Sequence, residues 1–144
     1  MNTNFTGIWQ ANLAKSRFAG PHPQALLVKI KHSGSELQQA ILSTNSDGSE
    51  QRALFHCSID PGKCGNFSLN GTAIPGRVDW EGEALVIESW IQFKARQIHL
   101  RDYWHLSADG QTLIMEHRDD DLAGQITVLE RLADNYHNPS RNRD

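Results

Sequence analysis

The stretch RQIHLRDYWHLSADGQTLIMEHR, residues 96–118, decides the fold that we predict for this chain. Polar and apolar side chains alternate in both of its halves, with Trp104 and Leu106 on one face of the first half and Leu113 and Met115 on one face of the second. A period of two is typical of a half-buried β-strand. The Asp109-Gly110 pair between the halves suits the positive φ angles of a tight hairpin turn. The stretch therefore predicts a β-hairpin with one buried face.

The same alternation recurs along the rest of the chain, between short turn signals such as Asp47-Gly48. No segment long enough for a major helix remains, and residues 14–19 are enough for one helical turn only. We therefore expect nine strands, joined by short links. Their predicted ranges are 5–12, 25–32, 36–44, 50–59, 71–80, 84–91, 96–106, 111–118 and 124–132.

Consecutive hairpins without helices predict an antiparallel meander. Such a sheet must protect its two edge strands, and closure into a barrel removes both edges. We therefore predict an all-β fold, a single antiparallel meander closed into a β-barrel of about 8–10 strands, which has room for side chains or one small ligand. A sandwich of two sheets is the alternative. The barrel is expected to span residues 1–133, followed by a flexible polar tail at residues 134–144.

The composition limits the classes of partner. With 144 residues, the chain is long enough for one domain with a buried core, and its 38% hydrophobic and 22% charged residues are typical of a soluble protein. The formal net charge of −3 argues against a nucleic-acid partner. No apolar run reaches the roughly 20 residues of a membrane-spanning helix. The start of the chain lacks the features of an export signal. We therefore expect a cytoplasmic protein if the sequence is complete, and a periplasmic or secreted one if a signal peptide was removed.

Cys57 and Cys64 flank a predicted turn at Pro61-Gly62. A disulfide across this turn and two free thiols are both compatible with the spacing. The spacing fits no zinc-binding motif, which needs four ligands at short, paired intervals. No phosphate-binding glycine loop and no nucleophile motif occurs either. The sequence therefore predicts no cofactor and no bound metal.

The predicted first strand carries Gly7 and Trp9 in a Gly-X-Trp motif, and the predicted last strand carries Arg131. This motif on an N-terminal strand resembles the opening signature of the lipocalin-like (calycin) barrels. Residues 78–89 and 104–113 are also similar to bacterial lipocalin-like proteins. The resemblance implies that Trp9 packs at the closed end of the barrel and that Arg131 lies across it, since a guanidinium stacks well on an indole ring. It also implies an apolar small molecule inside the barrel, although the superfamily includes enzymes.

Counting outward from the Asp-Gly turn places Trp104 opposite Met115 and Asp102 opposite His117, all with the parity of the predicted inner face. Directly opposed residues have Cβ atoms roughly 5 Å apart, so this carboxylate and imidazole are expected to be cross-strand neighbours. We interpret Asp102 and His117 as a candidate acid/base pair, beside a ligand that contacts Trp104 and Met115. A hydrogen-bonded structural pair at the barrel rim is the alternative.

Four further side chains are candidates for ligand contact: His56, Tyr103, Arg101 and Trp90. Arg101 and Tyr103 have the opposite parity to Trp104, so we expect them on a solvated outer face. If the parity were reversed, they would line the pocket and bind an anionic or carbonyl group. The parity of His56 leaves the cavity and the solvent both open. Trp90 is expected as an exposed aromatic residue at a rim, where it contacts a ligand or a partner.

Three functions follow from these expectations. The favoured one is binding of a small, mostly apolar molecule, aromatic or carbonyl-containing, in a hydrophobic pocket of the barrel. The second is a cofactor-independent enzyme, such as an isomerase, a cyclase or a lyase, that uses Asp102 and His117. The third is an interaction module, such as a homodimer formed through an outer sheet face that carries Tyr103 and Trp90.

Overall fold

The structure is a computed structural model, and it describes residues 4–18, 22–58, 64–93, 95–118 and 125–132. The predicted tail at 134–144 lies outside the described residues. Within the described residues the chain forms ten strands and no helix. The strands are β1 (Gly7–Ala11), β2 (Ala25–Ser33), β3 (Glu36–Thr44), β4 (Glu50–Ser58), β5 (Cys64–Leu69), β6 (Thr72–Glu81), β7 (Ala84–Phe93), β8 (Arg96–Leu106), β9 (Thr112–His117) and β10 (Ile126–Arg131).

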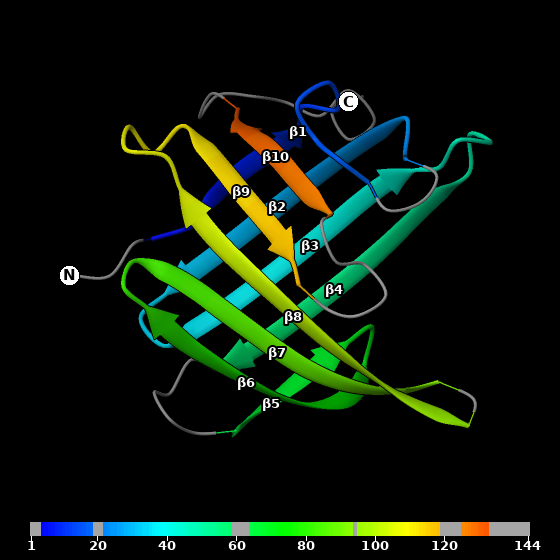
Figure 1. Cartoon of the computed structure of the whole chain (residues 1–144), viewed down its shortest axis with the longest axis vertical. Helices are drawn as coiled ribbons and strands as arrows, with labels where there is room; N and C mark the ends of the chain where they lie inside the picture. Colours follow the sequence, from blue (N-terminus) through cyan, green and yellow to red (C-terminus); the bar gives the residue numbers. More distant parts are fainter. Residues whose placement is uncertain (1–3, 19–21, 59–63, 94, 119–124, 133–144) are drawn as a thin grey trace, which may run out of the picture.

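Each strand pairs antiparallel with the next along the chain, and β1 also pairs with β10. The pairing order closes the meander into a barrel (Figure 1). The predicted barrel is therefore confirmed, and the two-sheet sandwich is wrong. A search for helices long and apolar enough to cross a membrane finds none among the described residues.

The hairpin of β8 and β9 has the predicted register. Trp104 lies opposite Met115, Asp102 lies opposite His117, and the turn between the strands includes Gly110 at a φ of 72°. The expected parity follows from this register, because successive side chains of a strand point to opposite faces of the sheet. Trp104 and Met115 are buried, at 3% and 8% exposure.

The ten strands lie within the predicted range of 8–10, and β5 is the strand that the sequence pattern missed. Gly65 and Asn66 weaken the strand pattern, because both residue types have low β-propensity. A hairpin turn follows at Asn70 and Gly71, with φ angles of 52° and 84°. These angles are those of a two-residue hairpin turn, for which Asn-Gly is the strongest sequence signal. Interpreting Asn70-Gly71 as a hairpin turn predicts a strand before it, which is β5.

One end of the barrel is closed around Trp9, which has no exposed surface. The guanidinium of Arg131 lies 4.3 Å from the centre of the Trp9 ring, and Arg131 Nη1 donates a hydrogen bond of 2.8 Å to the carbonyl oxygen of Thr6. Trp9 Nε1 donates to the carbonyl oxygen of Phe5. A Cβ atom added at Gly7 would lie 2.5 Å from Arg131 Nη1, which explains the glycine of the Gly-X-Trp motif.

Aromatic rings fill the barrel next to this closed end. Phe5 stacks on His32 and on Trp80, each at 6.0 Å between ring centres, and meets the edge of Trp104 at 5.9 Å. The amide of Phe5 donates a hydrogen bond of 3.3 Å to His32 Nδ1. Burial lowers the pKa of His32, because the charged imidazolium loses its hydration there. The closed end is therefore a plug of packed side chains.

Cys57 is a buried free thiol, so it forms no disulfide with Cys64 in this structure. The Cys64 side chain lies outside the described part of the chain. Burial raises the pKa of Cys57 to about 12, with a smaller contribution from the negative charge of Glu36.

Candidate ligand pocket at the open end of the barrel

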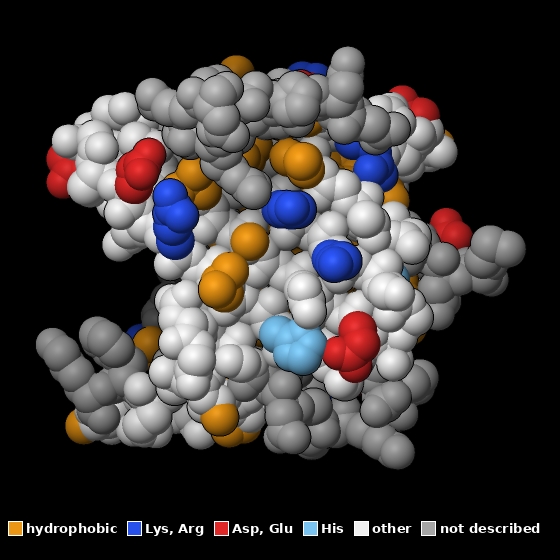
Figure 2. Space-filling model, turned by 180° about the vertical axis from the view of Figure 1, so that it is seen from behind, with side chains coloured by type: hydrophobic (Ala, Val, Ile, Leu, Met, Phe, Trp, Pro, Cys, Tyr) orange, Lys and Arg blue, Asp and Glu red, His pale blue; other side chains and the backbone are white. Residues whose placement is uncertain are grey.

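A pocket of about 620 Å³ opens at the end of the barrel away from Trp9. This volume is within the range of about 300–1,000 Å³ that is typical of small-molecule sites. The wall consists of inward-facing side chains of β2, β3, β8, β9 and β10, and the segments 22–23 and 45–47 contribute at the rim. Its apolar lining includes Leu26, Val28, Ile41, Trp104 and Met115. Viewed from behind, the molecule is hollowed on the side that carries the β3–β4 turn and the β7–β8 hairpin (Figure 2).

The segment after β1 is held against the mouth of the pocket. Arg17 and Ile126 exchange two backbone hydrogen bonds of 2.7 and 2.8 Å, and this bridge fixes the chain next to Phe18, which lines the pocket. His22 lines the same part of the wall. No sequence pattern indicated that Phe18 and His22 line the pocket, because the contact joins segments that are distant in the sequence.

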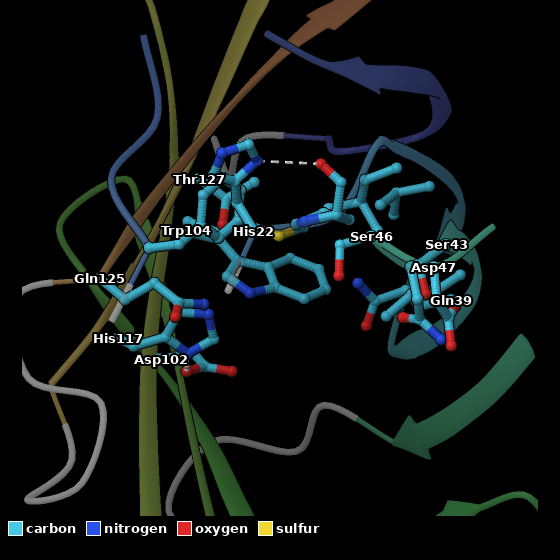
Figure 3. Close-up of a pocket in the computed structure, with 17 residues that line it drawn as sticks. His22, Gln39, Ser43, Ser46, Asp47, Asp102, Trp104, His117, Gln125 and Thr127 are labelled. Carbon is cyan, nitrogen blue, oxygen red and sulfur yellow. Dashed lines mark hydrogen bonds and ion pairs between the residues drawn. The ribbon is translucent and has the colours of Figure 1, made fainter. Parts of the chain in front are cut away.

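Trp104 lies at the centre of the pocket. Its indole ring projects between two groups of polar side chains that come from opposite walls (Figure 3). One group contains Asp102 and His117, and the other contains Gln39 and Ser43. An aromatic surface flanked by a few polar groups is the usual composition of a small-molecule site, where the polar groups fix the orientation of the ligand.

Asp102 and His117 meet across the β8–β9 ladder. His117 Nδ1 lies 2.5 Å from Asp102 Oδ1, and the two side chains are 23% and 28% exposed. The Asp102 Oδ1 atom is itself buried and accepts no hydrogen bond of favourable geometry from the described residues. The short distance is therefore an electrostatic pairing with His117, and it occupies the buried side of the carboxylate.

Gln125 completes this side of the pocket. Its carbonyl oxygen accepts a hydrogen bond of 2.9 Å from the amide of His117, which ties the end of β9 to the residue before β10. The Gln125 side chain lies beside those of His117 and Asp102 (Figure 3).

The opposite wall carries neutral polar groups and one carboxylate. Gln39 is 8% exposed and points inward from β3, where it shares the parity of Leu37 and Ile41. Asp47 lies at the rim, where its carboxylate accepts hydrogen bonds from the amide and the hydroxyl of Ser49. These hydrogen bonds hold the pKa of Asp47 below its ordinary value.

Of the sequence-predicted site residues, Asp102, His117, Trp104 and Met115 line one pocket together. Their catalytic and binding roles remain predictions. Gln39, Gln125 and Thr127 also line it, although sequence analysis did not single them out. Gln39 and Thr127 were detectable in principle, since each alternates with its neighbours at an inward position of a predicted strand.

The other four candidates do not line this pocket. His56 is exposed on the outer face of β4, where its Nε2 atom lies 2.9 Å from Glu36 Oε1. Trp90 has outward parity on β7, and its ring stacks on His99 at 5.1 Å between centres, with 5° between the ring planes. Neither residue therefore reaches a ligand inside the barrel.

Arg101 and Tyr103 also lie on the outer face, as the parity of β8 predicts. The guanidinium groups of Arg118 and Arg101 lie 3.8 and 5.4 Å from the centre of the Tyr103 ring. They cover the tyrosine so well that it is only 6% exposed. The reversed parity, which would have brought Arg101 and Tyr103 into the pocket, is wrong because the register turns odd-numbered residues of β8 outward.

The part of the chain that is described contains no group of three or more His, Cys, Asp or Glu side chains able to hold a metal ion. No family model matches the chain, and no curated protein matches it in sequence. Fold and site together define the class of protein: an all-antiparallel, closed β-barrel with a pocket at one end.

Proposed function

We propose that this protein is a lipocalin-like barrel that binds a small, mostly apolar molecule, aromatic or carbonyl-containing, in the pocket at Trp104. The observation that carries the proposal is the cavity of about 620 Å³, in which one aromatic surface lies between two polar walls. The lipocalin-like assignment is supported by the packing of Arg131 over Trp9 at the closed end.

The lining of the pocket can contribute both binding free energy and selectivity for the ligand. Apolar surface removed from water contributes about 25 cal/mol per Å², and an aromatic pair adds roughly 0.5–1.5 kcal/mol when the rings are well placed. The closed end is filled by its own side chains, so a ligand enters from the mouth and stops at Trp104. The polar groups at Asp102 and Gln39 then select how the ligand lies.

Native mass spectrometry of the purified protein, compared with its denatured mass, is the first test. We expect a retained small molecule that is lost on denaturation. A titration with the neutral probe N-phenyl-1-naphthylamine follows, with tryptophan fluorescence as the readout. We expect saturable quenching that Trp104→Phe largely removes.

Trp90→Phe is the matched control, because it removes a tryptophan of the outer face by the same substitution. We expect it to leave the affinity for the probe unchanged. Equal effects of the two variants, or probe binding that never saturates, would contradict a pocket at Trp104.

A second candidate function is acid/base catalysis without a cofactor, and the contact between Asp102 and His117 favours it. A carboxylate beside Nδ1 sets the tautomer in which Nε2 is the basic nitrogen, which is the arrangement of a histidine general base.

The molecule retained in native mass spectrometry decides between binding and catalysis. An enzyme converts it to a product that mass spectrometry or chromatography separates, and His117→Gln and Asp102→Asn abolish this conversion. A binder returns it unchanged, and the same substitutions alter only its affinity.

A further inference from the structure

The charges of the pocket have one sign. The described lining residues include two carboxylates, Asp47 and Asp102, and they include no lysine and no arginine. The basic residues closest in sequence to the Asp102–His117 pair are Arg101 and Arg118, and both guanidinium groups lie over Tyr103 on the outer face. The described lining therefore carries two carboxylates and neither lysine nor arginine.

The histidines that face the pocket, His22 and His117, are the remaining titratable groups of its lining. His22 Nδ1 lies 3.2 Å from the carbonyl oxygen of Pro23 at the rim. His117 lies beside Asp102, with its Nδ1 atom 2.5 Å from Asp102 Oδ1.

The exposed surface of Asp102 provides the second observation. The side chain is 28% exposed, although its Oδ1 atom is buried beside His117 Nδ1. Asp102 therefore presents the exposed part of its carboxylate to the pocket that it lines. A positively charged N–H group of a ligand would form a charge-assisted hydrogen bond there.

Trp104 lies directly beside this carboxylate in the register, two residues along β8 on the same face. An indole ring stacks with an aromatic ligand and also attracts a cation over its face. Carboxylate and indole together recognise a flat apolar ring that bears a protonated nitrogen a short distance away.

We propose that the pocket selects aromatic amines or amidines that are protonated at neutral pH, and that it discriminates against carboxylic acids. This inference rests on the proposed function and adds the chemical class of the ligand. The protonated nitrogen donates to the exposed part of the Asp102 carboxylate while the ring lies against Trp104. An anionic ligand would place a second negative charge beside Asp102, with no lysine or arginine in the described lining to compensate.

Three probes with the same ring test the proposal by isothermal titration calorimetry: 1-naphthylmethylamine, its neutral analogue 1-naphthylmethanol, and the anion 1-naphthoate. The measurement is made at about pH 8, where the amine is charged and histidines in general are neutral. We expect the amine to bind about tenfold more tightly than the alcohol, since a charge-assisted hydrogen bond is roughly twice as strong as a neutral one. The anion should bind most weakly.

Asp102→Asn removes the charge and keeps the shape of the side chain. We expect this variant to lose most of the preference for the amine over the alcohol. Glu36→Gln is the matched control, because it removes one negative charge from the exposed outer face and should leave the preference intact. If Asp102→Asn fails to fold, the ranking of the three probes on the unmodified protein still decides.

Each outcome has one meaning. Tighter binding of the alcohol or of the anion overturns the proposed ligand class and leaves a pocket-binding function standing. An amine preference that Asp102→Asn does not change also overturns it. Failure of all three probes to bind overturns the ligand class and the proposed function together.

Discussion

Arg131 lies across Trp9, with its guanidinium carbon 4.3 Å from the ring centre, and this contact joins the last strand of the barrel to the first. β1 and β10 also pair directly, with Trp9 opposite Arg131 in the register. The contact therefore lies at the seam where the barrel closes, and residues from both ends of the chain must be in place before it forms.

We expect Gly7→Ala to destabilise the protein. A Cβ atom at this position would lie 2.5 Å from Arg131 Nη1 and 3.2 Å from Trp9 Nε1, so the guanidinium must move off the indole. The expected cost is about 1–3 kcal/mol, the usual range for overpacking a filled site. Urea unfolding, followed by far-ultraviolet circular dichroism, measures the change in the free energy of unfolding.

The control is a double-mutant cycle with Arg131→Ala. If the clash with the guanidinium is the cause, Gly7→Ala costs clearly less in the Arg131→Ala background, because residues in contact do not contribute additively. A cost that is the same in both backgrounds would show that Gly7 is needed for another reason. Trp9→Ala should be the most damaging change at this end, at roughly 3–5 kcal/mol, because it removes a fully buried tryptophan.

The stability of the protein should fall as the solution becomes acidic, in part because of His32. Burial holds the pKa of His32 below its ordinary value of 6.5. Below about pH 6.5 the unfolded chain binds a proton that the folded His32 does not, so the free energy of unfolding decreases as the pH falls. Above that pH both states are neutral at this residue, and it contributes no pH dependence. The limiting slope for one proton is about 1.4 kcal/mol per pH unit.

His32→Asn tests this assignment, because an amide oxygen can take the place of Nδ1 as acceptor for the Phe5 amide and does not titrate. We expect the slope between about pH 5 and pH 6.5 to flatten in this variant. His105→Asn is the matched control, because it makes the same substitution at an exposed histidine of the outer face. A slope that His32→Asn leaves unchanged would place the pH dependence elsewhere.

Cys57 should be inert in the folded protein. The thiolate is the reactive form of cysteine, and burial raises the pKa of Cys57 to about 12. The experiment uses Cys64→Ser, so that Cys57 is the single cysteine of the chain. We expect almost no reaction with Ellman's reagent at about pH 8 under native conditions, and one equivalent of rapid reaction in denaturant. Rapid labelling of a folded sample would contradict the burial of this side chain.

Histidine ring signals should separate the inner face from the outer face. His117 and His105 lie on neighbouring strands, but His117 lines the pocket and His105 is exposed on the outer face. Addition of 1-naphthylmethanol should shift the His117 ring signals in a long-range ¹H–¹⁵N spectrum, and those of His105, His99 and His56 should not move. Shifts at the outer-face histidines alone would move the binding site to the barrel exterior.

Much of the fold was predictable from local patterns. The ranges predicted for β3 and β8 match the observed Glu36–Thr44 and Arg96–Leu106, and the other predicted strands differ by a few residues at their ends. A strand with one buried face imposes its period on the sequence, so the pattern shows it directly. The strand β5 was not predicted, because Gly65 and Asn66 do not follow that pattern. Its pairing with β6 is evident only in the structure.

The candidate site was predictable only where one hairpin supplies it. The facing of Asp102 and His117 followed from counting outward from the Asp109-Gly110 turn, since a tight turn fixes the register of its two strands. Gln39 could not be linked to them in this way, because it reaches the pocket from β3, on the opposite wall.

The sequence by itself determined the all-β meander, the inner parity of β8 and β9, and the pairing of Asp102 with His117. These features depend on the period of a strand and on the geometry of one turn, which are local. The tertiary structure decided that β1 closes on β10, that Phe18 and His22 lie at the mouth, and that Arg101 and Arg118 lie outside the pocket over Tyr103. These features depend on contacts between segments far apart in the chain. The alternating pattern of a strand cannot predict such contacts, because they form only after the sheet has curved and closed.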